Sequence, residues 1–415
     1  MRFDAVVACA VGLEDLVTEE LGELGHEAEP VKPAKLLVRD VDSEGVVSLN
    51  YLTRQATRVF LMAWVGEAAS PEDIRACAAE VDYTQYMAPD QTFGVKGVRA
   101  GEHDFTSTDI GAYVGAAVVD CFQARHGLRV RANLDEPDVQ FYAELRDSHF
   151  MITVNTTGDS LIRRHRRPYQ HFAPMRPNLA ATLLRMSSFD KGVSTLDPMA
   201  GGGTISTEAC MMARDMPAGY FRDKWAFERL HCIDDRAYAR VRHRALSSIV
   251  PSETKLGACD KYLRSVEGMR GNLTVQGLAD DIRTWEDMAE TLAGVEVGEY
   301  DTLVTNPPYG VRIGNPRVVR RLYDAFPKAA MDKGICEIVV TTPRQANICN
   351  ALTEAGYEVV EQRQFLYGGL WSSNITYAEF AFLQSRDLAV LNQRPGTASS
   401  VFAIWSPLIG KVDIT

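Results

Sequence analysis

The carboxyl-terminal half of this 415-residue chain predicts an α/β fold with a doubly wound parallel sheet, and the amino-terminal half predicts two smaller α+β units. From residue 192 onward, apolar strand-like runs alternate with helical segments. Five such runs are VSTLDP, KLGACD, LTVQGLADD, YDTLVTNPP and CEIVVTTP. The segment YEVVEQRQFLYGGLWSSNITYAEFAFL then predicts an antiparallel hairpin at one edge, which makes a sheet of seven strands.

The amino-terminal half shows shorter elements. We expect a strand over residues 3–10, a helix over 13–24 that ends at Gly25, and strands around 35–41 and 46–49. The next hundred residues alternate the strand-like runs VFLMAWVGEA, TFGVKGV, VQFYAEL and HFMITVNTT with two helical segments. The predicted organisation is therefore a small α+β domain (1–57), a second α+β domain (58–160), a basic linker and helix (161–191), the parallel-sheet domain (192–385) and a tail (386–415).

Composition excludes several classes of protein. With 46% hydrophobic and 24% charged residues the chain is globular, and it has no run of roughly 18 apolar residues that could span a membrane. The eight cysteines are scattered singly, which favours a reduced, cytoplasmic environment and no metal site. The opening MRFDAVVACAVGLED fits a strand that leads into a helix better than a secretion signal. A net charge of −11 argues, taken alone, against a nucleic-acid partner.

A glycine-rich loop follows the first parallel strand in LDPMAGGGTISTEA. Asp197 and Pro198 end the strand, Gly201 and Gly203 allow a sharp turn against a ligand, and Thr204 opens the next helix. Ligands of open α/β sheets bind beyond the carboxyl ends of the strands, near the point where strand order reverses. The alternative is a tight turn with no ligand.

Acidic residues follow the next two predicted strands. Asp260 ends KLGACD, where a carboxylate can accept the two hydroxyl hydrogens of a ribose. Asp280 and Asp281 end LTVQGLADD and could reach an adenine amine, although a single acid at a strand end is more often a helix cap. The long gap between the loop and Asp260 predicts an insertion over residues 215–250 and disfavours a nicotinamide cofactor.

The fourth strand ends in Asn306, Pro307, Pro308 and Tyr309. Two prolines cannot continue a central strand, so this rigid turn presents an amide and an aromatic ring outward. The amide oxygen of Asn306 and the carbonyl oxygen of Pro307 could accept both hydrogens of an exocyclic amine on a base, which localises the nitrogen lone pair for attack on a methyl donor. Tyr309 could stack on a base taken out of its helix, and such stacking, worth about 1–3 kcal/mol, roughly offsets the cost of extrusion.

The pair DPMAGGGT and NPPYG resembles class I S-adenosylmethionine-dependent methyltransferases that modify amino groups. Almost the whole chain resembles the THUMP-domain RNA guanine-N2 methyltransferases, through GLEDLVTEEL, FGVKGVRAGEHDFTSTDIGAYVG, DEPDVQFYAEL, RRHRRPYQHFAPMRPNLAATLL and LYGGL. The resemblance implies an amino-terminal ferredoxin-like domain (1–57), a THUMP RNA-binding domain (58–160) and a Rossmann-like S-adenosylmethionine-dependent catalytic domain. It implies structured RNA as the partner.

The resemblance also assigns roles by position. It places Asp197, Gly201 and Gly203 in the methionine-binding loop, Asp260 on the ribose, Asp281 or else Asp280 on the adenine, Asn306 to Tyr309 in catalysis, and Ala173, Pro174 and Asn178 in a linker over the cofactor. Two positions depart from the family. The usual C-G-S-G loop is Ala200 to Gly203 here, and the usual R-G-Y-R is Arg164 to Arg167, which loses an aromatic ring and gains charge.

Positive charge gathers in two segments in spite of the acidic total. Residues 161–185 carry +6 and residues 312–328 carry +4. We expect Arg163, Arg164, Arg166, Arg167, Arg312, Arg317, Arg320 and Arg321 to bind RNA phosphates. For the first four, the alternative is ion pairing with acids across the domain junction.

The substrate within the family is less sharply defined. GVRIGNPRVVRRLYDAFPKAA resembles the archaeal transfer-RNA branch, and PAGYFRDKWAFE resembles the bacterial large-subunit ribosomal-RNA branch, so we favour transfer RNA, with 23S ribosomal RNA as the alternative. NPPY also serves adenine-N6 and protein glutamine-N5 methylation, and a third possibility is an RNA-binding protein with vestigial catalysis. We expect a cytoplasmic monomer.

Overall fold

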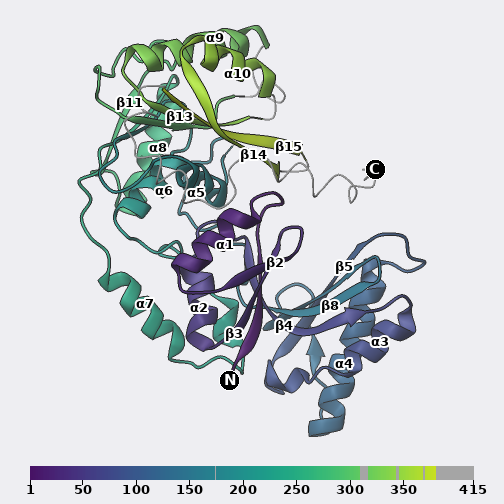
Figure 1. Ribbon diagram of the computed structural model, residues 1–415. Coiled ribbons are helices and arrows are strands. Elements are labelled where there is room, and N and C mark those ends of the chain that lie inside the picture. Colours follow the sequence, from purple (N-terminus) through teal and green to yellow (C-terminus); the bar gives the residue numbers. More distant parts are fainter. Residues whose placement is uncertain (173, 309–315, 343–344, 368–369, 380–415) are drawn as a thin grey trace.

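The structure of the protein, a computed structural model, describes residues 1–172, 174–308, 316–342, 345–367 and 370–379 (Figure 1). It contains one sheet of eight strands and one of seven. The predicted tail, 386–415, lies outside the described residues. Within the described ranges, no helix has the length and apolar character needed to cross a membrane.

The amino-terminal half forms the sheet of eight strands, in the order β2-β3-β1-β4-β8-β7-β5-β6. Its strands are β1 (Phe3–Ala8), β2 (Ala28–Lys32), β3 (Lys35–Val41), β4 (Arg58–Glu67), β5 (Thr92–Ala100), β6 (Arg131–Ala132), β7 (Val139–Arg146) and β8 (His149–Asn155). The long strand β4 pairs with β1 along one edge and with β8 along the other. The two α+β units expected from the sequence therefore share one sheet.

Helices α1 (Glu14–Glu23), α2 (Ser43–Tyr51), α3 (Pro71–Ala79) and α4 (Ser107–His126) and the short turn η1 (Tyr83–Gln85) complete this half. The predicted strand over 46–49 is wrong, because these residues lie in α2. Asp42 caps that helix by accepting a hydrogen bond from the Gly45 amide at 2.8 Å. Strand β2 was not expected from the sequence.

The carboxyl-terminal half forms the predicted sheet of seven strands, in the order β11-β10-β9-β12-β13-β15-β14. Its strands are β9 (Thr195–Asp197), β10 (Leu256–Asp260), β11 (Ile282–Glu286), β12 (Thr302–Thr305), β13 (Glu337–Thr342), β14 (Tyr357–Tyr367) and β15 (Leu370–Glu379). The pairs from β11 to β13 are parallel, and β15 pairs antiparallel with both β13 and β14. Strand order reverses between β9 and β12, which makes their carboxyl ends the expected ligand site.

Helices cover both faces of this sheet (Figure 1). Helices α5 (Pro177–Met186), α6 (Thr204–Ala213) and α8 (Leu263–Gln276) pack in one core, and α9 (Pro316–Asp332) and α10 (Gln345–Glu354) pack in the other. The side chains of β12 alternate between these cores, with Val304 in the first and Leu303 in the second. This two-sided burial explains why the parallel strands are almost continuously apolar.

The third parallel strand lies later in the chain than predicted. LTVQ belongs to α8, which ends at Gly277 with a φ of 67°, and the strand is β11. Asp280 and Asp281 therefore precede a strand instead of ending one, so they lie at the edge of the sheet opposite the carboxyl ends.

The predicted insertion, residues 215–250, packs against the amino-terminal half of the chain. Its residues include the short turn η2 (Ala226–Arg229) and helix α7 (Ala237–Ser247), which packs beside α2 (Figure 1). Trp225, Phe227 and Val241 are part of the same hydrophobic core as strand β1. In the opposite direction, Leu13 and Leu16 at the start of α1 join the core formed by α5, α6 and α8. The two halves are thus interlocked.

Candidate functional site

The glycine loop connects β9 to α6 at the reversal point of the sheet. Gly201 and Gly203 have φ angles of 54° and 79°, the left-handed region that favours glycine. A Cβ atom on Gly203 would lie 2.8 Å from Cγ of Met269 on α8, so the loop packs too closely for any side chain there. The amide of Ala200 donates to the carbonyl oxygen of Cys259 at 3.0 Å, which attaches the loop to β10.

The carboxylate of Asp260, at the end of β10, holds the glycine loop in place. One carboxylate oxygen accepts from the Gly201 amide at 3.0 Å and the other accepts from the Tyr262 amide at 3.0 Å. Each oxygen has a second lone pair, so the carboxylate can still accept hydroxyl hydrogens from a ligand. This is the position expected for a ribose-binding acid.

Asp197, at the end of β9, is buried and joins the first strand to the fourth. Its carboxylate accepts from the Thr305 hydroxyl at 2.8 Å and from the Met199 amide at 3.2 Å. Burial, together with the nearby charge of Asp260, raises the pKa of Asp197 to about 7, although both hydrogen bonds act in the opposite direction.

Asn306, Pro307 and Pro308 directly follow β12, next to the strand that carries the glycine loop. The carbonyl oxygen of Pro308 accepts from the Tyr323 hydroxyl of α9 at 3.0 Å, which holds the turn in place. Tyr309 and Arg312 lie outside the described residues. The structure thus brings Asn306 and the glycine loop to the same end of the sheet.

The linker before α5 crosses the glycine loop. The ring of His171 lies against Gly201, where an added Cβ atom would be 3.3 Å from Nδ1 of the histidine. Asn272 of α8 bridges the two segments, because its amide group donates to the carbonyl oxygens of Tyr169 and Gly202, both at 3.0 Å. Sequence reasoning gave no role to His171, although it lies in the family-like segment RRHRRPYQHFAPMRPNLAATLL, and it missed Asn272, which has no motif that would have singled it out.

Asn178 in the first turn of α5 is buried, and its side-chain oxygen has no hydrogen-bond partner among the described residues. An unsatisfied buried acceptor costs roughly 1–3 kcal/mol, so it fits a site that a ligand donor completes. Pro174 is exposed in the same linker, and Ala173 lies outside the described residues. The hydroxyl of Thr204 donates to the carbonyl oxygen of Met175 at 3.5 Å, so the first residue of α6 contacts the linker.

The structure corrects the acids expected near an adenine. Asp281 forms an ion pair at 2.9 Å with Arg214, which directly follows the last residue of α6. That end of α6 is the one away from the glycine loop, and Asp280 is the neighbour of Asp281 in sequence. The acids at the carboxyl end of β11 are Glu286, its exposed last residue, and Asp287, whose amide donates to the Asp260 carbonyl oxygen at 3.2 Å. Its own carboxylate accepts from the amides of Met288 and Gly294, both at 2.8 Å. Gly277, which ends α8, is the signal that could have moved the predicted strand to reach Asp287.

The predicted RNA-binding arginines divide into buried and exposed groups. Arg164 is 2% exposed and pairs with Glu208 of α6 at 2.9 Å, so the expectation that it binds RNA is wrong. Arg167 is half-buried and donates to Met175. The exposed members are Arg163, Arg166, which pairs with Asp223, and Arg317, Arg320 and Arg321 of α9.

Comparison with known proteins places these features in a family. Residues 164–373 match the RMKL-like methyltransferase domain, and residues 68–155 match the THUMP domain. The chain is 32% identical over 366 residues to the tRNA (guanine(6)-N2)-methyltransferase of Archaeoglobus fulgidus, covering 86% of this chain and 88% of that protein. It is 29% identical to the protein of the same name from Methanocaldococcus jannaschii, covering 88% of this chain and 97% of that protein.

Other relatives are longer or share the fold at lower identity. The ribosomal RNA large subunit methyltransferase K/L of Pseudomonas putida is 28% identical over 333 residues, but the match covers only 45% of its length. The crystal structure of TrmN from Thermus thermophilus matches with a TM-score of 0.68 at 24% identity over 91% of this chain and all of that chain. That of SMU.472, complexed with SAH, matches with a TM-score of 0.81 at 22% identity, covering 91% of this chain and 98% of that chain. The chain therefore belongs to the RMKL-like methyltransferase family and joins a THUMP domain to the catalytic domain of an S-adenosylmethionine-dependent methyltransferase.

Proposed function

We propose that this enzyme transfers a methyl group to the exocyclic N2 amine of a guanine in structured RNA, with transfer RNA as the favoured substrate. The observation that carries the proposal is the position of Asn306 and Pro307 at the carboxyl end of β12, directly beside the glycine loop of β9. Two acceptors on a rigid turn suit an amine with two hydrogens.

The residues at this end of the sheet fit a nucleoside-bearing methyl donor. Asp260 would hold the ribose, the Gly201–Gly203 loop and Asn178 would hold the methionine portion, and Asp287 replaces Asp280 and Asp281 as the acid on the adenine side. Pro198, Thr204 and Pro174 would line the same site. When bound, S-adenosylmethionine supplies an electrophilic methyl group.

The protein side chains orient the acceptor instead of acting as a strong base. The Asn306 amide oxygen and the Pro307 carbonyl oxygen accept the amine hydrogens, which turns the nitrogen lone pair toward the donor. Pro308 keeps the turn stiff, and Tyr309 stacks on the base. Rate enhancement then depends on alignment and on stabilising the charge that develops on the amine.

Guanine and transfer RNA are supported by the relatives. Both archaeal relatives that match over most of their length are named for N2 methylation of guanine in tRNA. The THUMP match and the exposed Arg163, Arg166 and α9 arginines support docking of structured RNA. We further propose that the enzyme works as a monomer in the cytoplasm and without a metal.

A second candidate substrate is 23S ribosomal RNA. It is favoured by the similarity to the Pseudomonas putida ribosomal RNA methyltransferase and by the insertion PAGYFRDKWAFE, which the structure packs against the amino-terminal half. The match covers only 45% of that relative, whereas it covers 88% and 97% of the two tRNA methyltransferases, and this difference favours transfer RNA.

The test is deletion of the gene, followed by mass spectrometry of nucleosides from size-separated transfer and ribosomal RNA. Loss of N2-methylguanosine from transfer RNA is expected. Loss from large-subunit ribosomal RNA alone would replace the favoured substrate with the second. Unchanged N2-methylguanosine in both fractions would overturn the proposal.

A further inference from the structure

Glu208 is a fully buried carboxylate at the meeting point of three parts of the chain. It lies one turn into α6, the helix that begins directly after the glycine loop. It accepts hydrogen bonds from Arg164 Nε at 2.9 Å and from His165 Nε2 at 2.5 Å, and Arg54 Nη1 lies 3.4 Å away. Although burial favours the protonated form, Arg164 and His165 hold the pKa of Glu208 well below its ordinary value, so it is ionised at neutral pH.

The protonation of His165 follows from its two partners. Arg167 donates to Nδ1 of His165 at 2.9 Å, so Nδ1 must be an acceptor and Nε2 must carry the proton that is donated to Glu208. Burial lowers the pKa of His165 to about 4 in spite of the neighbouring carboxylate. At neutral pH the histidine is therefore a neutral, oriented donor.

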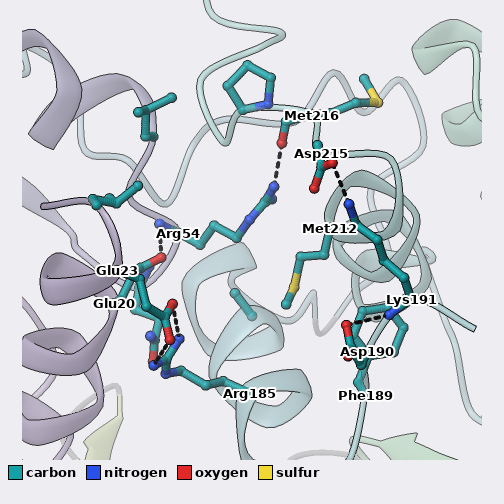
Figure 2. Close-up of a pocket in the computed structure, with 15 residues that line it drawn as sticks. Glu20, Glu23, Arg54, Arg185, Phe189, Asp190, Lys191, Met212, Asp215 and Met216 are labelled. Atoms are coloured by element: carbon teal, nitrogen blue, oxygen red, sulfur yellow. Dashed lines mark hydrogen bonds and ion pairs between the residues drawn. The ribbon is translucent and has the colours of Figure 1, made fainter. Parts of the chain in front are cut away.

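The partners of Glu208 come from different domains. Arg54 follows α2 in the amino-terminal half and also donates to the Met216 carbonyl oxygen beyond the end of α6, as Figure 2 shows. Arg164 and His165 lie near the start of the linker, and Arg164 donates in turn to the carbonyl oxygen of Arg54 at 2.6 Å. One carboxylate thus joins the amino-terminal half, the linker and α6.

A cavity of about 470 Å³ lies beside this junction (Figure 2). Arg54 and Glu20 border it on the amino-terminal side, and Met212 and Met216 border it on the catalytic side. Below Arg54 in Figure 2, beside Glu20, Arg185 of α5 pairs with Glu23 of α1 at 2.7 Å. Polar side chains thus line the cavity at the junction, beside the apolar contacts that Leu13 and Leu16 make with the catalytic core.

The linker continues from Glu208 to the glycine loop. Six residues separate Arg164 from His171, whose ring lies against Gly201, and Asn272 bridges Tyr169 and Gly202 within this stretch. The loop is therefore tied to Glu208 by two routes. One is the first turn of α6, and the other is the linker that lies over the loop.

We propose that Glu208 is a positioning residue for cofactor binding, which holds α6 and the linker so that the glycine loop and His171 keep their relative places. The inference rests on the proposed use of S-adenosylmethionine. A purely structural ion pair would affect the stability of the fold, because removing one partner leaves a buried charge uncompensated. A positioning residue also changes affinity for the cofactor in protein that remains folded.

The test is a direct measurement of S-adenosylmethionine affinity by isothermal titration calorimetry, at a temperature where circular dichroism shows each variant folded. Glu208→Gln is expected to weaken binding about tenfold, because small misplacements of a binding loop are costly. The matched control is Glu20→Gln, at a side chain 7% exposed at the same junction. Its carboxyl group accepts from the main-chain amides of Arg54 and Gln55 and, within the described part of the chain, forms no hydrogen bond with α6 or with residues 161–172. Its affinity should stay within twofold of the wild type.

If Glu208→Gln does not fold, two substitutions of its partner His165 test the same role. His165→Gln retains a donor for Glu208 and an acceptor for Arg167, so affinity should be kept, whereas His165→Leu should weaken it. Wild-type affinity in folded Glu208→Gln and His165→Leu, or equal losses in Glu20→Gln, would overturn the positioning role. Absence of binding by the wild type would instead overturn the proposed function.

Discussion

The hydroxyl of Thr305 donates a hydrogen bond of 2.8 Å to the buried carboxylate of Asp197. Backbone pairing between β12 and β9 joins Thr302 to Thr195 and Leu303 to Leu196, and this side-chain bond extends the contact to the carboxyl ends of both strands. It connects the strand that presents Asn306 to the strand that carries the glycine loop. On the proposed mechanism, this contact links the turn that would hold the acceptor amine to the loop that would hold the methyl donor.

Thr305→Val should weaken S-adenosylmethionine binding about tenfold and lower kcat. The substitution keeps the shape of the side chain but removes a donor to a buried carboxylate, and such bonds are worth about 1.5–3 kcal/mol. Thr302→Val at the other end of β12 is the control, because that hydroxyl donates to Glu337 at 3.2 Å, away from the loop. Equal cofactor affinity in the two variants would contradict the role of the Thr305 contact.

Asp197→Asn should change how stability depends on pH. The pKa of Asp197 is raised from 3.8 to about 7, so the folded state binds a proton more tightly than the unfolded state does. Asp197 therefore destabilises the wild type progressively as pH rises from about 4 to about 7, by up to roughly 4 kcal/mol. Asparagine does not titrate, so the variant should gain stability relative to the wild type over that range in urea unfolding. Parallel curves for the two proteins would contradict the raised pKa.

Replacing Arg317, Arg320 and Arg321 with glutamine should weaken RNA binding and flatten its salt dependence. Each lost phosphate contact reduces the slope of log K against log salt by about 0.7–0.9. A matched control is given by three exposed arginines beside α2, namely Arg236, which directly precedes α7, and Arg240 and Arg244 within α7. An unchanged slope in the α9 variant would show that these arginines do not contact the RNA.

The sequence predicted six of the seven strands of the carboxyl-terminal sheet at their places in the chain, and two of the polar residues at their carboxyl ends. Buried parallel strands are short apolar runs, so Asp260 and Asn306 stand out as the polar residues that follow them. The same reasoning failed over 46–49 and in LTVQGLADD, because short apolar runs do not distinguish a strand from a buried helix. In the first case, α2 is held by packing against α7, almost two hundred residues later.

The contacts of Glu208 were beyond sequence reasoning for a different reason. Arg164 precedes it by 44 residues and Arg54 by 154, and a run of arginines gives no indication of which one is buried. Composition predicted the charge of the linker correctly, but only the fold shows that Arg164 faces inward while Arg163 and Arg166 face solvent.

The most direct test of the account is methyl transfer by the purified enzyme. Unmodified transfer RNA is incubated with S-adenosylmethionine and either wild-type protein or Asn306→Ala, and the digested nucleosides are identified by mass spectrometry. The wild type should produce N2-methylguanosine, and Asn306→Ala should lose turnover by at least a hundredfold with RNA affinity nearly unchanged, because Asn306 acts on one amine while docking lies elsewhere. Methylated adenosine as the product, or full activity of Asn306→Ala, would contradict the account.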